Sequence, residues 1–359
     1  MTKRDVPAEP ARRRFGLLAI AGVAGLAGAT WPYSGLAGVT WPYSGLAGAS
    51  RHHFGLAGAL SQDGGGPAGR RIPLGVYGGA GCTGVPAVEA FQAWLGRPVQ
   101  VVLDFLQMDS WPGMLNEAGW ITGCWKQLPG RTLAISVPML VGAGHPTLNQ
   151  GAEGRFDAHF RTLAHRLVSG GDADAFVRIG WEFNGGWYPW TARGHAAAFA
   201  RYWRRIALAM RSVPGARFRF DWCPAMIDGP TAAAYPGDDV VDVIGLDVYN
   251  QSWPLITSPL RRWDYLLHHA AGLIWHRDFA KAHGKPRSFP EWGTGTRPDG
   301  HGAGDDPLFI RNMIGWMQEG GPVAYECYWN YRAPDYDAKV TDGRLPAAAA
   351  ALRRGLRAL

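Results

Sequence analysis

From Ile72 onward, short apolar runs alternate with longer segments in which apolar residues recur at helical spacing. Eight of the apolar runs are predicted to be strands, at 72–79, 99–106, 132–139, 175–183, 218–224, 242–250, 286–293 and 323–331. Helix-like segments fall between them, among others at 85–96, 154–169, 195–212, 259–283 and 306–319. The units between the first two strands and between the fifth and sixth are the weakest. Such regular alternation implies parallel strands joined by crossover helices.

Eight strand–helix units over about 280 residues fit a closed (β/α)8 TIM barrel better than an open sheet. No glycine-rich phosphate fingerprint opens a helix after the first strand, which disfavours a nucleotide-binding fold. We therefore expect one α/β domain, a (β/α)8 barrel, over 72–359. Over all 359 residues, the apolar content of 47% and the charged content of 18% exclude a chain that is disordered throughout. Because no uninterrupted apolar run reaches about 18 residues, no stable membrane insertion is expected.

The formal net charge of +7 does not point to nucleic acid. Residues 1–30 contain five basic residues against two acidic ones, and no cluster of Lys or Arg with interleaved aromatics follows them. The 17 Trp residues are more informative. Tryptophan buries a large ring while its N–H needs a partner, so an excess of Trp suits clefts that are partly wet.

The first 71 residues are predicted to be an export signal followed by a linker. RRRFGLL at 12–18 leads into a weakly apolar stretch over 15–29, and small residues at 27–29 suit cleavage. This segment resembles a twin-arginine signal peptide, which implies that 1–29 directs the protein to the periplasm or the extracellular space. A ten-residue unit beginning GLAGATWPYS then repeats, so we expect 30–71 to be a disordered, glycine-rich linker.

No cofactor or metal is expected from the sequence. The four cysteines form no C-x-x-C pair, and no spacing of His and carboxylates suggests a metal site. Their pairing stays open: a disulfide between Cys82 and Cys124 and four free thiols both fit the spacing. The cysteines are Cys82, Cys124, Cys223 and Cys327.

Carboxylates and aromatic residues gather at the predicted carboxyl ends of the strands, where (β/α)8 barrels place their functional groups. Aromatic rings stack on the faces of sugars, and carboxylates accept hydrogen bonds from sugar hydroxyls, so these residues indicate a carbohydrate cleft. The side chains predicted to bind substrate are Trp181, Asn184, Trp187, Trp222, Asp247, Tyr249, Trp292 and Trp329.

Glu182 and Glu291, at the ends of the fourth and seventh strands, are the predicted catalytic pair. Cleavage of a glycoside needs one carboxylic acid to protonate the leaving oxygen. It also needs a second carboxylate to attack the anomeric carbon or to activate water. The alternative for each residue is a structural salt bridge at the rim. Two glutamates on separate strands, flanked by Trp and Asn, favour catalysis, with a polysaccharide or oligosaccharide as substrate and a monomer as the working form.

Residues 178–190, RIGWEFNGGWYPW, resemble the acid/base segment of glycoside hydrolase family 26, which carries Glu-x-Asn-Gly-x-Trp after its fourth strand. GLDVYN at 245–250 and PEWGT at 290–294 are similar to the sixth- and seventh-strand segments of that family. The resemblance implies that Glu182 is the acid/base and Glu291 the nucleophile. It also implies that Tyr249 donates a hydrogen bond to the nucleophile and that Trp329 forms the floor of a sugar subsite.

The resemblance implies a secreted retaining hydrolase that cleaves internal β-linkages, most closely an endo-β-1,4-mannanase. Two positions depart from the family pattern: Trp181 stands where the family usually has His, and Asn330 stands where mannanases often have Arg. Both lie near the sugar being cleaved, so they weaken mannan as the substrate more than hydrolysis as the reaction. A β-glucan, xylan or bacterial exopolysaccharide remains as an alternative substrate, and a catalytically silent glycan-binding barrel as an alternative function.

Export by the twin-arginine route predicts that replacing Arg12 and Arg13 with Lys leaves the precursor in the cytoplasm, because recognition requires the arginine pair. Immunoblotting of cell fractions measures where the protein accumulates. Unchanged export of the double variant would contradict the proposed route.

Overall fold

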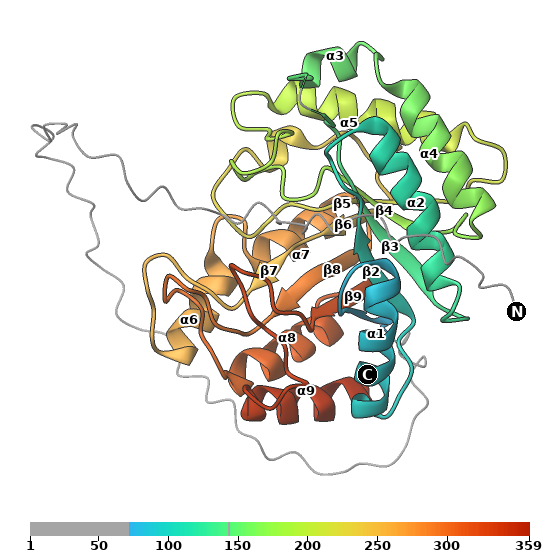
Figure 1. Cartoon of the computed structure of the whole chain (residues 1–359). Coiled ribbons are helices and arrows are strands. Elements are labelled where there is room, and N and C mark those ends of the chain that lie inside the picture. The colour runs from blue at the N-terminus through green and yellow to red at the C-terminus, as the bar shows by residue number, and fades with distance from the viewer. Residues whose placement is uncertain (1–71, 143) are drawn as a thin grey trace, which may run out of the picture. The chain divides into compact units, whose positions relative to one another are not determined.

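The computed structural model describes residues 72–142 and 144–359. The predicted signal peptide over 1–29 and the linker over 30–71 lie outside them. In the described part, parallel strands form one sheet in the order β6-β5-β4-β3-β2-β1-β9-β8-β7, and pairing between β6 and β8 closes it into a barrel (Figure 1). The strands are β1 (Leu74–Tyr77), β2 (Val101–Phe105), β3 (Thr132–Val137), β4 (Phe176–Ile179), β5 (Arg219–Trp222), β6 (Val243–Gly245), β7 (Val248–Tyr249), β8 (Arg287–Gly293) and β9 (Val323–Trp329).

The predicted strand over 242–250 is present as two pieces, β6 and β7, which both pair with β8. Counting these two as one interrupted strand gives the eight-stranded barrel that the sequence predicts. The other seven strands each lie inside their predicted ranges.

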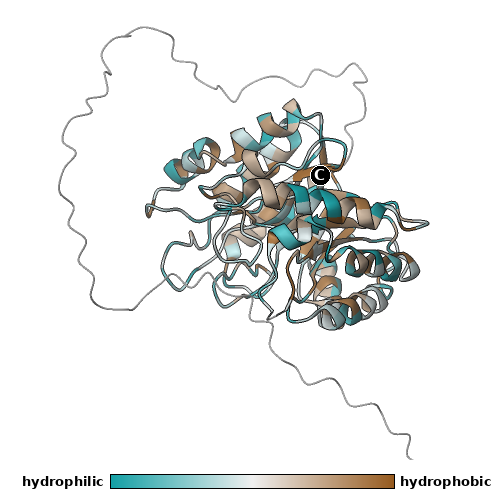
Figure 2. Ribbon diagram, turned by 90° about the horizontal axis from the view of Figure 1, so that it is seen from above, coloured by the Kyte–Doolittle hydropathy of each residue, from teal (hydrophilic) through white to brown (hydrophobic). Residues whose placement is uncertain are grey.

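Helices surround the barrel, and Figure 2 shows both hydrophobic and hydrophilic residues along them, as expected for helices with one face on the sheet and one in water. The helices are α1 (Gly81–Leu95), α2 (Trp111–Trp125), α3 (Leu148–Ala152), α4 (Asp157–Ser169), α5 (Ala196–Arg211), α6 (Pro259–His268), α7 (Leu273–Ala282), α8 (Pro307–Glu319) and α9 (Pro346–Ala358). None of the helices in the described residues is long and apolar enough to cross a membrane.

Two connections differ from a regular strand–helix unit, and both shape the carboxyl-terminal face of the barrel. The predicted helix over 259–283 is broken into α6 and α7 around Gly272, where an added Cβ would lie 2.5 Å from the carbonyl oxygen of Leu266. After β5 the chain forms only the 3-10 turn Ala232–Ala234, in agreement with the weak unit predicted there. The long β5–β6 connection is therefore free to line a site.

Three helices begin at a polar cap followed closely by proline. Ser110 at α2 accepts a hydrogen bond from the N–H of Gly113, and Asp306 at α8 accepts from the N–H groups of Leu308 and Phe309. Ser258 caps α6 in the same way as Ser110 caps α2. These side chains satisfy N–H groups that have no partner inside the helix, and proline is tolerated there because it lacks an N–H.

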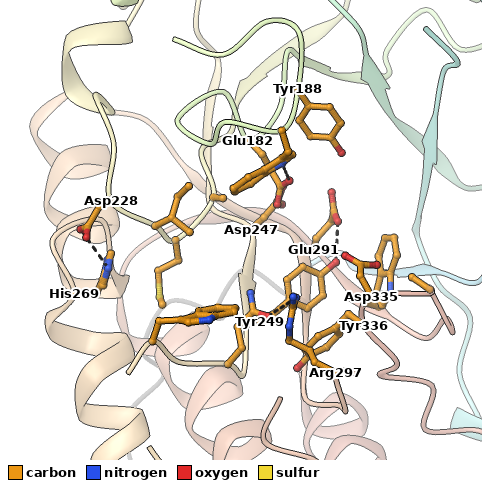
Figure 3. A pocket seen from close by; sticks show the side chains of 18 of the residues that line it. Glu182, Tyr188, Asp228, Asp247, Tyr249, His269, Glu291, Arg297, Asp335 and Tyr336 are labelled. Carbon is orange, nitrogen blue, oxygen red and sulfur yellow. Dashed lines mark hydrogen bonds and ion pairs between the residues drawn. The ribbon is translucent and has the colours of Figure 1, made fainter. Parts of the chain in front are cut away.

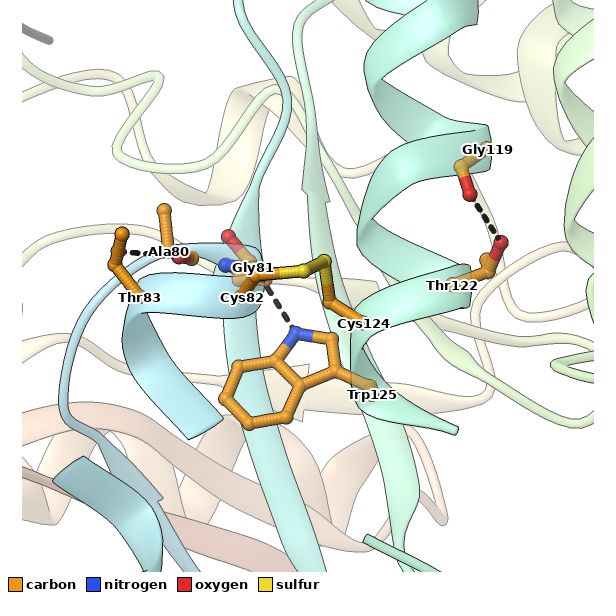
Figure 4. Close-up of a disulfide and its surroundings, with 9 residues drawn as sticks. Ala80, Gly81, Cys82, Thr83, Gly119, Thr122, Cys124 and Trp125 are labelled. Atoms are coloured by element: carbon orange, nitrogen blue, oxygen red, sulfur yellow. Dashed lines mark hydrogen bonds between the residues drawn. A yellow bond between two sulfur atoms is a disulfide. The ribbon is translucent and has the colours of Figure 1, made fainter. Parts of the chain in front are cut away.

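A disulfide joins Cys82, in the first turn of α1, to Cys124, in the last turn of α2 (Figure 4). Of the two alternatives that the sequence left open, the structure therefore has the Cys82–Cys124 disulfide. Cys223 and Cys327 are free and buried. Nearby, Asp104 on β2 accepts hydrogen bonds from the backbone N–H of Gly81 and from the indole of Trp125, both at 2.7 Å. Asp104 thus holds the same two helices together.

Candidate active site

A cavity of about 360 Å³ opens at the carboxyl ends of the strands (Figure 3). Six of the ten predicted site residues line it: Glu182, Trp187, Asp247, Tyr249, Glu291 and Trp329. They come from segments far apart in the sequence, and the barrel alone brings them together. A volume of a few hundred cubic ångströms with convergent polar groups is typical of a ligand site.

A local irregularity in β8 directs Glu291 into the cavity. Ser288 and Glu291 both face the barrel interior although they are three residues apart, which strict alternation along a strand would not allow. The register of β8 shifts between Phe289 and Trp292, around Pro290. Such bulges re-aim side chains next to active sites, and proline fits there because its missing N–H is not needed for pairing.

Arg178, in the middle of β4, is fully buried beneath the cavity and bridges several strands. Both of its terminal nitrogens lie 3.0 Å from Oε1 of Glu291, and Nη2 lies 2.6 Å from Oδ2 of Asp247. Nη1 also donates to the hydroxyl of Ser136 at 2.8 Å. Planar guanidinium groups are well suited to this work because their donors form a rigid fork.

Tyr249 completes the partners of Glu291, since its hydroxyl donates to Oε2 at 2.8 Å. This hydrogen bond is the one that the family resemblance implied. Glu291 is thereby held at both oxygens, one by a cation and the other by a phenol. Its side chain cannot turn without breaking one of these contacts, which suits a nucleophile that must be aimed at a single atom.

Glu182 has a different environment. Its backbone φ is 52°, a left-handed conformation that is uncommon for residues other than glycine, and its N–H donates to the carbonyl of Cys223 at the end of β5. Among the described residues its carboxyl group forms no ion pair and accepts one hydrogen bond, from Nε1 of Trp187 at 2.8 Å. An orientation fixed by backbone strain is a feature of functional sites.

The two carboxyl groups next to Glu291 compete for one positive charge. Burial, followed by the charge of Glu291, raises the pKa of Glu182 to about 8, while the Trp187 hydrogen bond and Arg178 oppose the rise. Burial also raises the pKa of Asp247. Because Asp247 receives a direct bond from Arg178 and Glu182 does not, the cluster holds its proton on Glu182.

Trp329 closes the cavity next to the two glutamates. One face of its ring stacks on Tyr77, with ring centroids 4.4 Å apart, and its edge meets the ring of Tyr249. Its indole N–H is buried and has no hydrogen-bond partner among the described residues.

Trp222 and Trp292 do not reach the cavity, so the expectation that they bind substrate does not hold. Trp222 follows Asp221 and Trp292 follows Glu291, both of which face the barrel interior. Because side chains alternate along a strand, each tryptophan points to the outer face of the barrel. Trp292 donates to Glu326 at 2.6 Å, and Trp222 packs against Phe279 beneath the helices. Both are fully buried in the layer between sheet and helices.

Trp181 and Asn184 are also absent from the cavity wall and act as supports. Both oxygen and nitrogen of the Asn184 side chain bond to the backbone of Ala225, at 2.9 and 2.8 Å, which ties the β4 loop to the β5–β6 connection. Trp181 is buried and donates from Nε1 to the hydroxyl of Tyr188. Each of the two side chains therefore holds a residue that does line the cavity, Tyr188 or Ala225.

The sequence pattern did not reveal Arg178, which lies beneath the cavity, or several of the residues that line it. A charged residue in the middle of the apolar run AFVRIG was the available signal, because an arginine in a buried strand must be paired. Other missed lining residues, such as Trp253 and His269, lie in loops without a periodic pattern. His269 reaches the cavity because the chain breaks between α6 and α7 at this point.

No group of three or more His, Cys, Asp or Glu residues within 72–142 and 144–359 is arranged to hold a metal ion.

Comparisons with known proteins agree with this geometry. The family model described as "Glycosyl hydrolase family 26" matches residues 165–262, less than half of the chain but including Arg178, Glu182, Asp247 and Tyr249. None of the curated proteins compared with the chain matches it.

Solved structures share the fold at low sequence identity. A modular endo-β-1,4-mannanase from Cellulomonas fimi is similar with a TM-score of 0.57 and 19% identity, covering 77% of this chain and 70% of that one. A mannanase from Bacillus subtilis is similar with a TM-score of 0.54 and 18% identity, covering 77% of this chain and 84% of that one. A family 26 β-mannanase from Bacteroides ovatus has a TM-score of 0.55 and 17% identity, and the match covers 80% of this chain and 89% of that one.

The barrel, the two glutamates on one cavity and the family match define the class of protein. The chain is a glycoside hydrolase on a (β/α)8 barrel. The segment over 165–262 is the part that is similar to family 26 in sequence.

The environment of Glu182 predicts the alkaline limit of activity. A general acid works only while protonated, so kcat/KM on an unactivated substrate should fall as pH rises through about 8. Trp187→Phe removes a hydrogen bond that favours the charged form of Glu182, and this fall should then move to higher pH. A pH–rate profile of both proteins measures the shift.

The matched control is an aryl glycoside with an activated leaving group, on which the alkaline fall should disappear because no proton is required. A fall that is the same for both leaving groups, or that stays in place in Trp187→Phe, would contradict the assignment of the proton to Glu182.

Proposed function

We propose that the protein is an exported, retaining glycoside hydrolase that cleaves internal β-linkages of a polysaccharide, with β-1,4-mannan as the first candidate. The observation that carries the proposal is the unequal environment of two glutamates on one cavity. Glu291 is held by Arg178 and Tyr249. The carboxyl group of Glu182 is half-buried, forms no ion pair within the described part of the chain, and has its pKa raised to about 8. Retaining hydrolysis requires this difference between a nucleophile and an acid.

In the proposed reaction, Glu291 attacks the anomeric carbon while Glu182 gives its proton to the departing oxygen. A glycosyl–enzyme ester forms at Glu291 and the glycosidic C–O bond breaks. Glu182, now ionised, accepts a proton from water, which attacks the anomeric carbon and releases the sugar and Glu291. Two inversions at the same carbon return the product to the β configuration.

The choice of mannan rests on the family resemblance and on the mannanases that share the fold. The structure gives a reason to test other glycans beside it. Asn330, at the position where mannanases often have Arg, directs its side chain to the backbone N–H of Val340 and the hydroxyl of Thr341 and does not line the cavity. The sugar bound there would meet no cation from this position. A β-glucan, xylan or bacterial exopolysaccharide is therefore the second candidate substrate.

Export is proposed on the twin-arginine resemblance alone. It agrees with a polysaccharide substrate, since polymers of this size are met outside the cytoplasm. The Arg12 and Arg13 substitutions described above test it separately from catalysis.

A panel of polysaccharides tests the proposed activity: β-1,4-mannan, mixed-linkage β-glucan, xylan and a bacterial exopolysaccharide, each followed by reducing-sugar release and viscosity. We expect mannan to be cleaved fastest, with viscosity falling early because internal bonds break. Glu291→Gln should abolish the activity, since no ester can form.

Glu326→Gln is the matched control. Glu326 is buried on the outer face of β9, bonded to Trp292, and its pKa is raised by burial to about 8, so a neutral amide should serve in its place and leave activity intact. Release of reducing sugar from none of the polymers would support the silent glycan-binding barrel instead.

A further inference from the structure

Tyr188 places a phenol hydroxyl in the cavity that the proposed reaction does not use. The residue lines the cavity and its ring is buried, stacked on Trp190 with ring centroids 4.5 Å apart. Figure 3 shows the hydroxyl pointing into the cavity toward the two glutamates. The ring has little freedom, so the hydroxyl occupies one place.

The partner of this hydroxyl determines what it can do. Nε1 of Trp181 donates to the Tyr188 oxygen at 3.0 Å, and an indole nitrogen can only donate. The tyrosine oxygen therefore already accepts a hydrogen bond, and its own proton must point elsewhere. Among the described residues no acceptor lies within hydrogen-bond distance of that proton, which leaves a donor facing the cavity.

Trp181 is itself fixed in turn. Its ring packs against Tyr188 and Trp190, and its carbonyl accepts a hydrogen bond from the Trp190 indole at 2.9 Å. The three aromatic residues thus form one rigid unit. Of its polar side-chain protons, that of Tyr188 is the one without a partner in the described part of the chain. Preorganised donors of this kind lose little entropy when a ligand binds.

The surroundings keep the phenol protonated. Burial, followed by the charges of Glu182 and Glu291, raises the pKa of Tyr188 well above its ordinary value. The hydroxyl is therefore a neutral donor across the working pH range. It lies close enough to both catalytic carboxyl groups to feel their charge.

We propose that Tyr188 is a specificity-determining residue that donates a hydrogen bond to the sugar hydroxyl on the carbon next to the anomeric centre. The inference rests on the proposed function. In a retaining site the anomeric carbon lies between two carboxyl groups about 5–5.5 Å apart. The charges of both Glu182 and Glu291 act on the Tyr188 hydroxyl, so this donor faces the part of the cavity where the reacting ring would bind. Of the hydroxyls on that ring, the one next to the anomeric carbon gains most from a donor, because its hydrogen bonds strengthen in the transition state.

The test pairs a change in the protein with a change in the substrate. The probes are the 2,4-dinitrophenyl β-glycosides of mannobiose and cellobiose, with analogues lacking the 2-hydroxyl or the 3-hydroxyl of the reacting ring. Tyr188→Phe should lower kcat/KM on the parent compounds about tenfold or more, and should have little effect on the 2-deoxy analogues. The 3-deoxy analogues should show the same loss as the parents.

Two further variants separate positioning from folding. Trp181→Phe keeps a ring but removes the N–H that fixes the Tyr188 hydroxyl, so the dependence on the 2-hydroxyl should shrink. Tyr235→Phe is the matched control, because the Tyr235 hydroxyl donates to Asp238 and does not line the cavity. In this variant the ratio between the rates on the parent and 2-deoxy compounds should equal that of the wild-type protein. The ratio between parent and 2-deoxy rates is insensitive to the fraction of protein folded.

An equal loss on parent and 2-deoxy compounds in Tyr188→Phe would overturn the inference, as would a dependence on the 3-hydroxyl in place of the 2-hydroxyl. If the wild-type protein cleaved neither parent glycoside, the proposed function would fail first and the inference with it.

Discussion

The site is organised around one buried cation. Arg178 contacts both Asp247 and Glu291 with no exposure to solvent, so it links β4 to the strand pieces around β7 and to β8. Removing one partner of a buried ion pair lowers the free energy of unfolding by about 3–5 kcal/mol, because the other charge is left buried and uncompensated. Arg178 and its two carboxylate partners therefore depend on one another. The same guanidinium makes the two glutamates unequal, because it bonds directly to Glu291, whereas the only partner of the Glu182 carboxyl group in 72–142 and 144–359 is the Trp187 N–H. Two carboxyl groups of the same type thereby come to have different environments, which is the basis for the different roles that we propose for them.

Backbone geometry determines where those groups point. The register shift in β8 turns Glu291 inward, and the left-handed backbone at Glu182 directs the other carboxyl group into the cavity. Around them, residues that the chain keeps out of the cavity act as its supports. Asn184 ties the β5–β6 connection to the β4 loop, and Trp181 holds the Tyr188 hydroxyl. The positions of the cavity-lining residues thus depend on buried residues behind them.

Much of the fold was predictable because its signals are periodic. The strands around Arg178 and Glu291 fall within the predicted ranges, as apolar runs separated by helical patterns indicate closed parallel sheets. Strand ends also located the two glutamates and Tyr249. The orientation of Trp222 and Trp292 was not predicted correctly, since a residue name at a strand end does not say which face it occupies. The ion pairs of Arg178, the break between α6 and α7 and the cavity loops depend on tertiary contacts, which no local pattern encodes.

The central claim is the division of labour between Glu182 and Glu291, and the stereochemistry of azide rescue tests it most directly. In Glu182→Ala an activated aryl glycoside should still form the ester at Glu291, and azide, with no carboxylate in its way, should then accelerate release. NMR should identify the product as a β-configured glycosyl azide, because two inversions have taken place. An α-configured azide, or rescue in Glu291→Ala in place of Glu182→Ala, would contradict the account.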